Sequence, residues 1–137
     1  MHISLRLPLA LALVSPLGLL ASTTPSAATT HVTISDCGIA KVAPSSLIIS
    51  CADANRSITN ITWHHWGSTV ATGTGTLHWN TCTPTCVAGT WRQSPLSFRA
   101  TNRVTHGATT MYTALSGPRG SFGTSGTTWT LATPVAG

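Results

Sequence analysis

The chain has 137 residues, enough for one domain, and a formal net charge of +5. Its charged residues are seven Lys or Arg and two Asp or Glu, or 7% of the chain, against about a quarter in a typical domain. The two carboxylates are Asp36 and Asp53, and no glutamate is present, which leaves little material for a two-carboxylate glycosidase. Hydrophobic residues make up 42%, so the composition is not that of a disordered chain.

The N-terminal segment has the order of a secretory signal peptide. A charged residue, Arg6, precedes an apolar stretch over residues 7–21, and small residues follow, with a cleavage motif at 26–28. Roughly fifteen apolar residues are fewer than the about 20 that a spanning helix needs. We therefore predict a signal peptide over residues 1–28 and one secreted, extracellular domain over 29–137, without a transmembrane segment.

The remainder of the chain shows the pattern of short strands. β-Branched residues dominate, apolar residues do not recur at three and four, and Gly or Pro interrupts the runs about every ten residues. The expected strands cover residues 31–35, 46–51, 57–66, 69–72, 75–79, 94–100, 108–115 and 127–131. We expect a hairpin turn within residues 71–76 (ATGTGT) and a loop over 80–89. About seven strands of this kind predict an all-β fold, an antiparallel β-sandwich.

Four cysteines follow the signal: Cys37, Cys51, Cys82 and Cys86. An even number of cysteines in a small exported domain indicates disulfides rather than free thiols. Three pairings are possible. We favour Cys37–Cys51 and Cys82–Cys86, because the members of each pair are close in sequence and separated by turn-forming residues.

The spacing from Cys51 to Trp63 resembles strands B and C of an immunoglobulin-like domain, in which a tryptophan follows the cysteine of the preceding strand. The second cysteine of that family, two residues after a tyrosine, is absent, because Tyr112 is followed by Thr113 and Ala114. The resemblance implies an immunoglobulin-like sandwich without the antibody-type bridge. It implies no function.

Ligand-type side chains occur within one short span: His64, His65, His78, Cys82 and Cys86. Adjacent strand histidines point to opposite faces, and cysteines oxidised during export cannot act as thiolate ligands. We therefore predict no metal site. The segment from Asp53 begins like a calcium loop but has Ile58 where glycine is required, so an Asx turn from Asp53 to Asn55 is the better interpretation.

Catalytic signatures are missing as well. No G-x-S-x-G nucleophile motif is present, and residues 71–76 lack the lysine of a phosphate-binding loop. The sequence predicts no catalytic residue, no cofactor and no enzymatic activity.

Tryptophan is unusually frequent, with five in the chain. Trp63 has the same strand phase as Ile61 and is expected in the core, whereas Trp66 has the opposite phase. Exposed tryptophans suit sugar stacking or a protein interface. The candidate binding surface consists of His64, Trp66, Trp79 and Trp91. The alternative is that the sheets and loops bury these rings.

Four motifs occur in a fixed order: residues 51–55 (CADAN), 63–67 (WHHWG), 71–75 (ATGTG) and 80–86 (NTCTPTC) with Gly89. On these motifs the chain resembles a group of small secreted proteins of high-GC Gram-positive bacteria, over roughly residues 37–115. It departs from them at residues 94–99, where they continue with an alternating strand. The resemblance implies an exported bacterial protein and assigns no activity, ligand or catalytic residue.

Together these observations predict a non-enzymatic exported domain that binds a cell-envelope component or a secreted protein. The weak positive charge suits an anionic cell-wall polymer or serves solubility alone. No nucleic-acid partner is expected. Two alternatives remain open: a secreted protease inhibitor that presents the Cys82–Cys86 loop, or a small secreted hydrolase.

Overall fold

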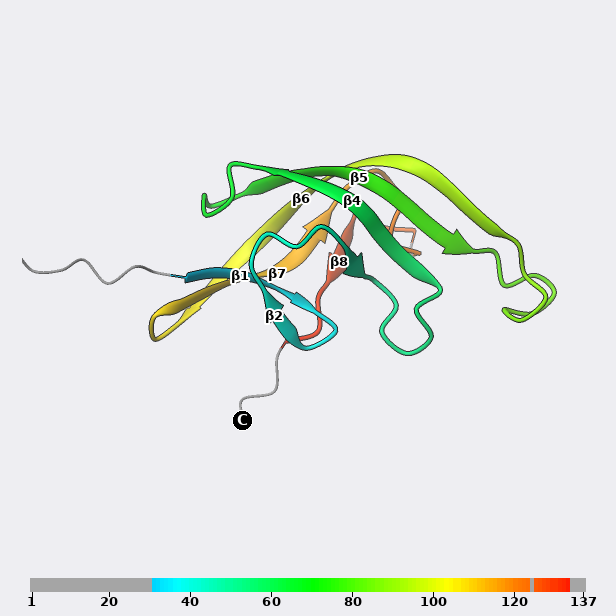
Figure 1. Cartoon of the computed structure of the whole chain (residues 1–137), viewed down its shortest axis with the longest axis horizontal. Helices are drawn as coiled ribbons and strands as arrows, with labels where there is room; N and C mark the ends of the chain where they lie inside the picture. Colours follow the sequence, from blue (N-terminus) through cyan, green and yellow to red (C-terminus); the bar gives the residue numbers. More distant parts are fainter. Residues whose placement is uncertain (1–30, 124, 134–137) are drawn as a thin grey trace, which may run out of the picture.

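The computed structural model describes residues 31–123 and 125–133, so the predicted signal peptide lies outside the described residues (Figure 1). The described chain forms eight strands: β1 (His31–Asp36), β2 (Ile39–Lys41), β3 (Leu47–Ile48), β4 (Arg56–His64), β5 (Ala71–Asn80), β6 (Trp91–His106), β7 (Thr109–Ser116) and β8 (Thr128–Thr130). The all-β prediction is confirmed. None of the described residues belongs to a helix that could span a membrane.

The strands join in one curled, mixed sheet in the order β2-β1-β7-β6-β5-β4-β3, with β8 paired to the last residues of β7. Strands β4 to β7 form an antiparallel meander, and β1 runs parallel to β7. The long strands β5 and β6, of 10 and 16 residues, arch over the molecule (Figure 1). Twist accumulated along such strands lets one sheet enclose a core by itself. The described strands therefore do not clearly form a two-sheet, immunoglobulin-like sandwich.

The curl brings the two ends of the sheet together, at β1–β2 and at β3. A disulfide joins Cys37, which follows β1, to Cys51, which follows β3. Beside it, the main-chain N–H of Ile48 donates a 2.8 Å hydrogen bond to Oδ1 of Asp36. Lys41 Nζ donates to the other carboxylate oxygen of Asp36, which is buried. A covalent bond and a buried carboxylate thus link the two sheet ends.

The inner face of the sheet forms the hydrophobic core. Strands β5 and β6 alternate between buried and exposed side chains, as sheet geometry requires. The glycines of residues 71–76 lie inside β5 and not in the hairpin turn we expected. Gly73 lies under the ring of Phe98, where an added Cβ would be only 2.6 Å from Phe98 Cζ. Gly75 likewise lies against the main chain of Thr59. The glycines therefore provide space for close packing.

The connection between β7 and β8 packs against this inner face. Phe122, near its middle, is 1% exposed and belongs to the core cluster. Arg56 Nη1 donates a 2.8 Å hydrogen bond to the carbonyl of Ser121 and lies over the ring of Trp79. Burial lowers the pKa of the Arg56 guanidinium. This connection covers part of the open side of the curl.

Candidate functional site

The hairpin of β5 and β6 projects from the body of the molecule, and its end carries the second disulfide (Figure 1). We call residues 80–91 the tip. Within it, Cys82 is bonded to Cys86, so both predicted disulfide pairs are present in the structure. The Cα atoms of Cys82 and Cys86 lie 3.7 Å apart, so the three residues between them form a compact loop.

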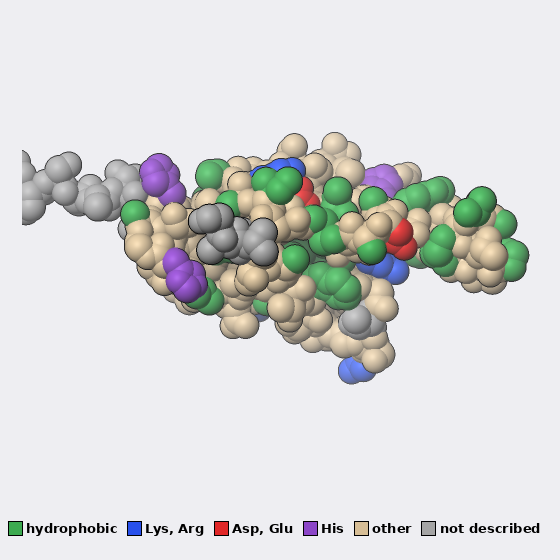
Figure 2. Space-filling model, turned by 90° about the horizontal axis from the view of Figure 1, so that it is seen from below, with side chains coloured by type: hydrophobic (Ala, Val, Ile, Leu, Met, Phe, Trp, Pro, Cys, Tyr) green, Lys and Arg blue, Asp and Glu red, His purple; other side chains and the backbone are tan. Residues whose placement is uncertain are grey.

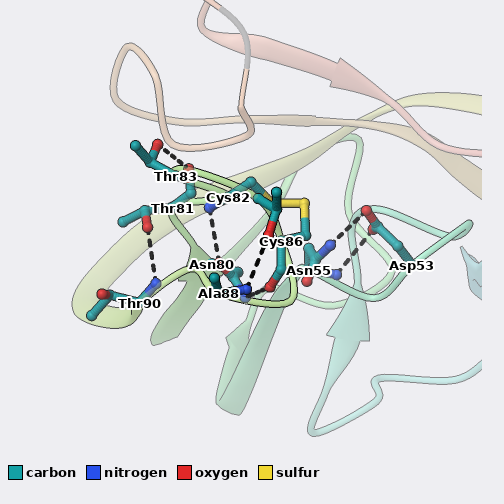
Figure 3. The surroundings of a disulfide bond; sticks show 10 residues. Asp53, Asn55, Asn80, Thr81, Cys82, Thr83, Cys86, Ala88 and Thr90 are labelled. Carbon is teal, nitrogen blue, oxygen red and sulfur yellow. Dashed lines mark hydrogen bonds between the residues drawn. A yellow bond between two sulfur atoms is a disulfide. The ribbon is translucent and has the colours of Figure 1, made fainter.

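Side-chain hydrogen bonds hold the tip in one shape (Figure 3). Asn80 spans the loop: its Nδ2 donates to the carbonyl of Cys86 at 2.9 Å, and its Oδ1 accepts from the main-chain N–H of Cys82 at 2.8 Å. Thr81 and Thr90 are joined by two further bonds, of 2.9 and 3.0 Å. These bonds satisfy main-chain groups that a loop would otherwise leave to water, so the tip is pre-organised.

Gly89 is required by this arrangement. A Cβ at this position would lie 2.0 Å from Oδ1 of Asn80 and 2.8 Å from the main-chain nitrogen of Cys82. Any larger residue would therefore displace the Asn80 side chain from the loop. The sequence pattern from Asn80 to Gly89 thus encodes one defined loop structure.

An Asx turn supports the tip from the neighbouring strand connection (Figure 3). Oδ1 of Asp53 accepts a 3.1 Å bond from the Asn55 main-chain N–H, and Oδ2 accepts a 2.6 Å bond from Asn55 Nδ2, which confirms the predicted turn. The main-chain bond, followed by the side-chain bond, lowers the pKa of the exposed Asp53 carboxyl. The carbonyl of Asn55 accepts a 2.9 Å bond from the Asn80 N–H. The turn is therefore connected directly to the base of the tip.

Apolar side chains are exposed on the tip. Val87 is fully exposed at 101% and Trp91 is 56% exposed. Figure 2 shows hydrophobic side chains gathered at this projecting end of the molecule. A single exposed apolar residue is ordinary, but a group of them on a braced projection is the kind of surface that a partner covers.

Trp79 and Trp91 lie on opposite faces of the sheet. Trp79 pairs with Arg92 across the β5–β6 ladder, and Trp91 pairs with Asn80, so the two rings have opposite phases. Trp79 is half-buried against the core and faces Arg56, with 6.0 Å from the guanidinium carbon to the ring. Trp91 alone of this pair lies on the outer face. The structure does not bring the two rings together into one surface.

Trp66 also has a packing role. Its ring lies 4.8 Å from that of Trp63 and 5.3 Å from that of Tyr112. The expected opposite phase of Trp66 differs from the structure, because β4 ends at His64 and the positive φ of His65, 56°, turns the chain back towards the core. Trp66 therefore packs beside Trp63, which lies on the inner face as predicted.

Of the four candidate residues, His64 and Trp91 are exposed on the outer face, beside opposite ends of β5. Val87 was not among the residues predicted from the sequence. The signal was available, because an apolar residue placed between a short disulfide loop and an obligatory glycine has no strand in which to be buried.

Comparisons with protein-family models, with curated proteins and with solved structures find no match to this chain. The site is therefore interpreted from its own geometry.

Proposed function

We propose that this protein is a non-enzymatic binding module that acts outside the cell and recognises a protein partner through the tip. The observation that carries the proposal is the exposure of Val87, in a loop that a disulfide and the Asn80 side chain hold in shape, and of Trp91, at the adjoining start of β6. The two disulfides support an extracellular setting, because thiols in the cytosol are kept reduced.

The energetics favour recognition at this position. Ordering a flexible loop costs about 0.5–1.5 kcal/mol per immobilised side chain, and a loop that is already ordered avoids most of this cost. Tryptophan is among the residues that contribute most at interfaces, since one side chain buries a large apolar area. Because the tip is narrow and projecting, the matching partner surface is a pocket or cleft.

A protease inhibitor would use the same tip in a different way. Inhibition in the substrate mode requires an extended segment in the protease cleft, whereas residues 83–85 lie between two Cα atoms only 3.7 Å apart. We therefore assign the contact to Val87 and Trp91 and not to residues 83–85. Unchanged activity of a panel of secreted serine proteases in the presence of the protein is the expected result.

The test compares two double variants as baits on a surface exposed to secreted and envelope proteins. The tip variant V87S/W91S removes the proposed contact. The control variant V70S/V104S removes two valines that are 39% and 42% exposed elsewhere. All four side chains are exposed, so both variants should keep the fold, which circular dichroism and disulfide content can verify.

We expect at least one protein to bind the wild type and the V70S/V104S control with equal affinity and to bind V87S/W91S at least tenfold more weakly. A partner retained equally by all three baits would place the interface elsewhere. Turnover of a substrate by the protein itself would contradict its assignment as a non-enzymatic module.

A further inference from the structure

The outer face of the sheet is lined with hydroxyl groups. On β5 the buried residues Ala71 and Gly73 alternate with Thr72 and Thr74, which therefore point away from the core. On β6 the buried Phe98 separates Ser97 and Arg99 in the same way, and Arg99 is exposed. The polar residues of neighbouring strands thus share one face.

A groove of about 580 Å³ lies on this face. Gly73, Phe98 and Gly117 lie along its middle, and the polar residues that line it are Thr72, Thr74, Ser97, Arg99, Ser116 and Thr127. They come from β5, β6, β7 and the chain just before β8, so the floor of the groove is the sheet. The groove is open, which suits a segment of a chain-like ligand better than a small molecule enclosed on all sides.

The strand register places one cation in the middle of a row of hydrogen-bonding groups. His64 pairs with Thr72, Thr72 with Arg99, and Arg99 with Ser116. Neighbouring strands lie about 4.8 Å apart, so Arg99 has a hydroxyl-bearing residue beside it on each neighbouring strand. A second row, with Thr74 opposite Ser97, lies alongside.

The protein leaves this cation available. Among the described residues the only salt bridge joins Lys41 to Asp36, and Asp53 is held in its turn by Asn55. No carboxylate of the described chain pairs with Arg99. A guanidinium offers five N–H donors in a planar fork, which matches a carboxylate or a phosphate.

We propose that the groove binds a saccharide that carries an oxyanion, with Arg99 on the oxyanion and the surrounding Thr and Ser hydroxyls on the sugar hydroxyls. Serine and threonine both donate and accept, as sugar hydroxyls do, so the hydroxyls that flank the middle of the groove can bind successive sugars of a chain. The site is independent of the tip, because Ser97 is six residues from Trp91 along β6, roughly 20 Å.

The test measures affinity by calorimetry for three probes of equal length. One is an oligogalacturonate, which carries carboxylates. The second is an oligosaccharide with 6-phosphate groups, and the third is a neutral oligogalactoside. We expect one of the two anionic probes to bind at least tenfold more tightly than the neutral probe. The anion that binds better identifies the ligand source, and equal binding of all three probes would overturn the proposal.

Two arginines of β6 provide a matched comparison. Arg99→Gln removes the proposed contact, whereas Arg92→Gln makes the same charge change at a residue of the opposite phase, beside Trp79. We expect at least a tenfold loss of affinity for the preferred probe in R99Q and less than a twofold loss in R92Q. Equal losses in both variants would mean that only the net charge attracts the polymer, and would contradict a site at Arg99.

Discussion

The two disulfides of this protein are chemically the same bond in two different surroundings. Cys37–Cys51 joins the two ends of the curled sheet and lies beside the buried carboxylate of Asp36. Cys82–Cys86 closes a loop at the end of a projecting hairpin. The first bond restricts how the sheet can open, and the second restricts the shape of an exposed loop.

This difference shows that the role of a disulfide depends on what lies next to it. Near the first bond, Leu47 and Ile49 are 1% and 2% exposed, so the bridge retains core residues. Near the second bond, Val87 has no contact with the core and Trp91 is more than half exposed. We therefore expect loss of the first bond to reduce stability and loss of the second to reduce binding.

The largest expected effect on stability is that of C37S/C51S. The bond closes a loop with a sequence separation of 14, for which the chain-entropy relation gives about 3 kcal/mol. The free energy of unfolding, measured by urea denaturation, should fall by about that amount. A change below about 1 kcal/mol would show that Asp36 and the core hold the sheet ends without the bridge.

The corresponding change at the tip, C82S/C86S, should cost less stability. The sequence separation is 4, for which the same relation gives about 2 kcal/mol as an upper value. The flanking β5–β6 ladder remains in place, while Asn80 loses the closed loop that it spans. Partner affinity, measured as for V87S/W91S, should fall at least tenfold. If binding survives reduction of this bond alone, pre-organisation of the tip is not required.

An intermediate loss of stability is expected for Asp36→Ala, at the junction where Asp36 and the Cys37–Cys51 bond link the two sheet ends. The substitution removes a buried carboxylate, and it leaves the Ile48 N–H without its acceptor and the partly exposed Lys41 without its partner. Removing one member of a buried hydrogen-bonded group costs about 1–3 kcal/mol, which urea denaturation can measure. Asp53→Ala, in the exposed turn beside the tip, is the control and should cost clearly less. Equal losses would mean that the junction is not the more sensitive region.

Local features of both regions could be predicted from the sequence. The two disulfides and the Asp53–Asn55 turn join residues that are close in the chain, where spacing and residue type limit the possibilities. The order of the strands could not be predicted, because the parallel pairing of β1 with β7 joins His31 to Thr109, from opposite parts of the described chain. Nothing in the alternation of either strand specifies its neighbour.

The candidate site was predictable only in part, for a similar reason. Strand alternation explains why Trp63 points inwards, but it assumes a regular strand. The positive φ of His65 turns Trp66 towards Tyr112, whose hydroxyl is hydrogen-bonded to Gly67, 45 residues before it in the chain. Trp79 lies against Arg56, which is itself hydrogen-bonded to Ser121 of the β7–β8 connection. Such contacts depend on the curl of the sheet, which is a property of the whole fold.

The smallest expected effect is the pH dependence of the Asp53 turn. The bonds from Asn55 lower the pKa of Asp53 from its ordinary value of 3.8, so ionised Asp53 stabilises the folded state. This contribution is fully present above pH 3.8 and is lost as the pH falls through the lower folded-state pKa. The isosteric variant D53N keeps an oxygen acceptor but not the charge. Its urea midpoint should lie below that of the wild type at pH 6, and the difference should shrink in increasingly acid buffers. A difference that is constant with pH would assign the effect to the shape of the turn and not to its charge, and would leave Asp36 as the carboxylate on which the fold depends.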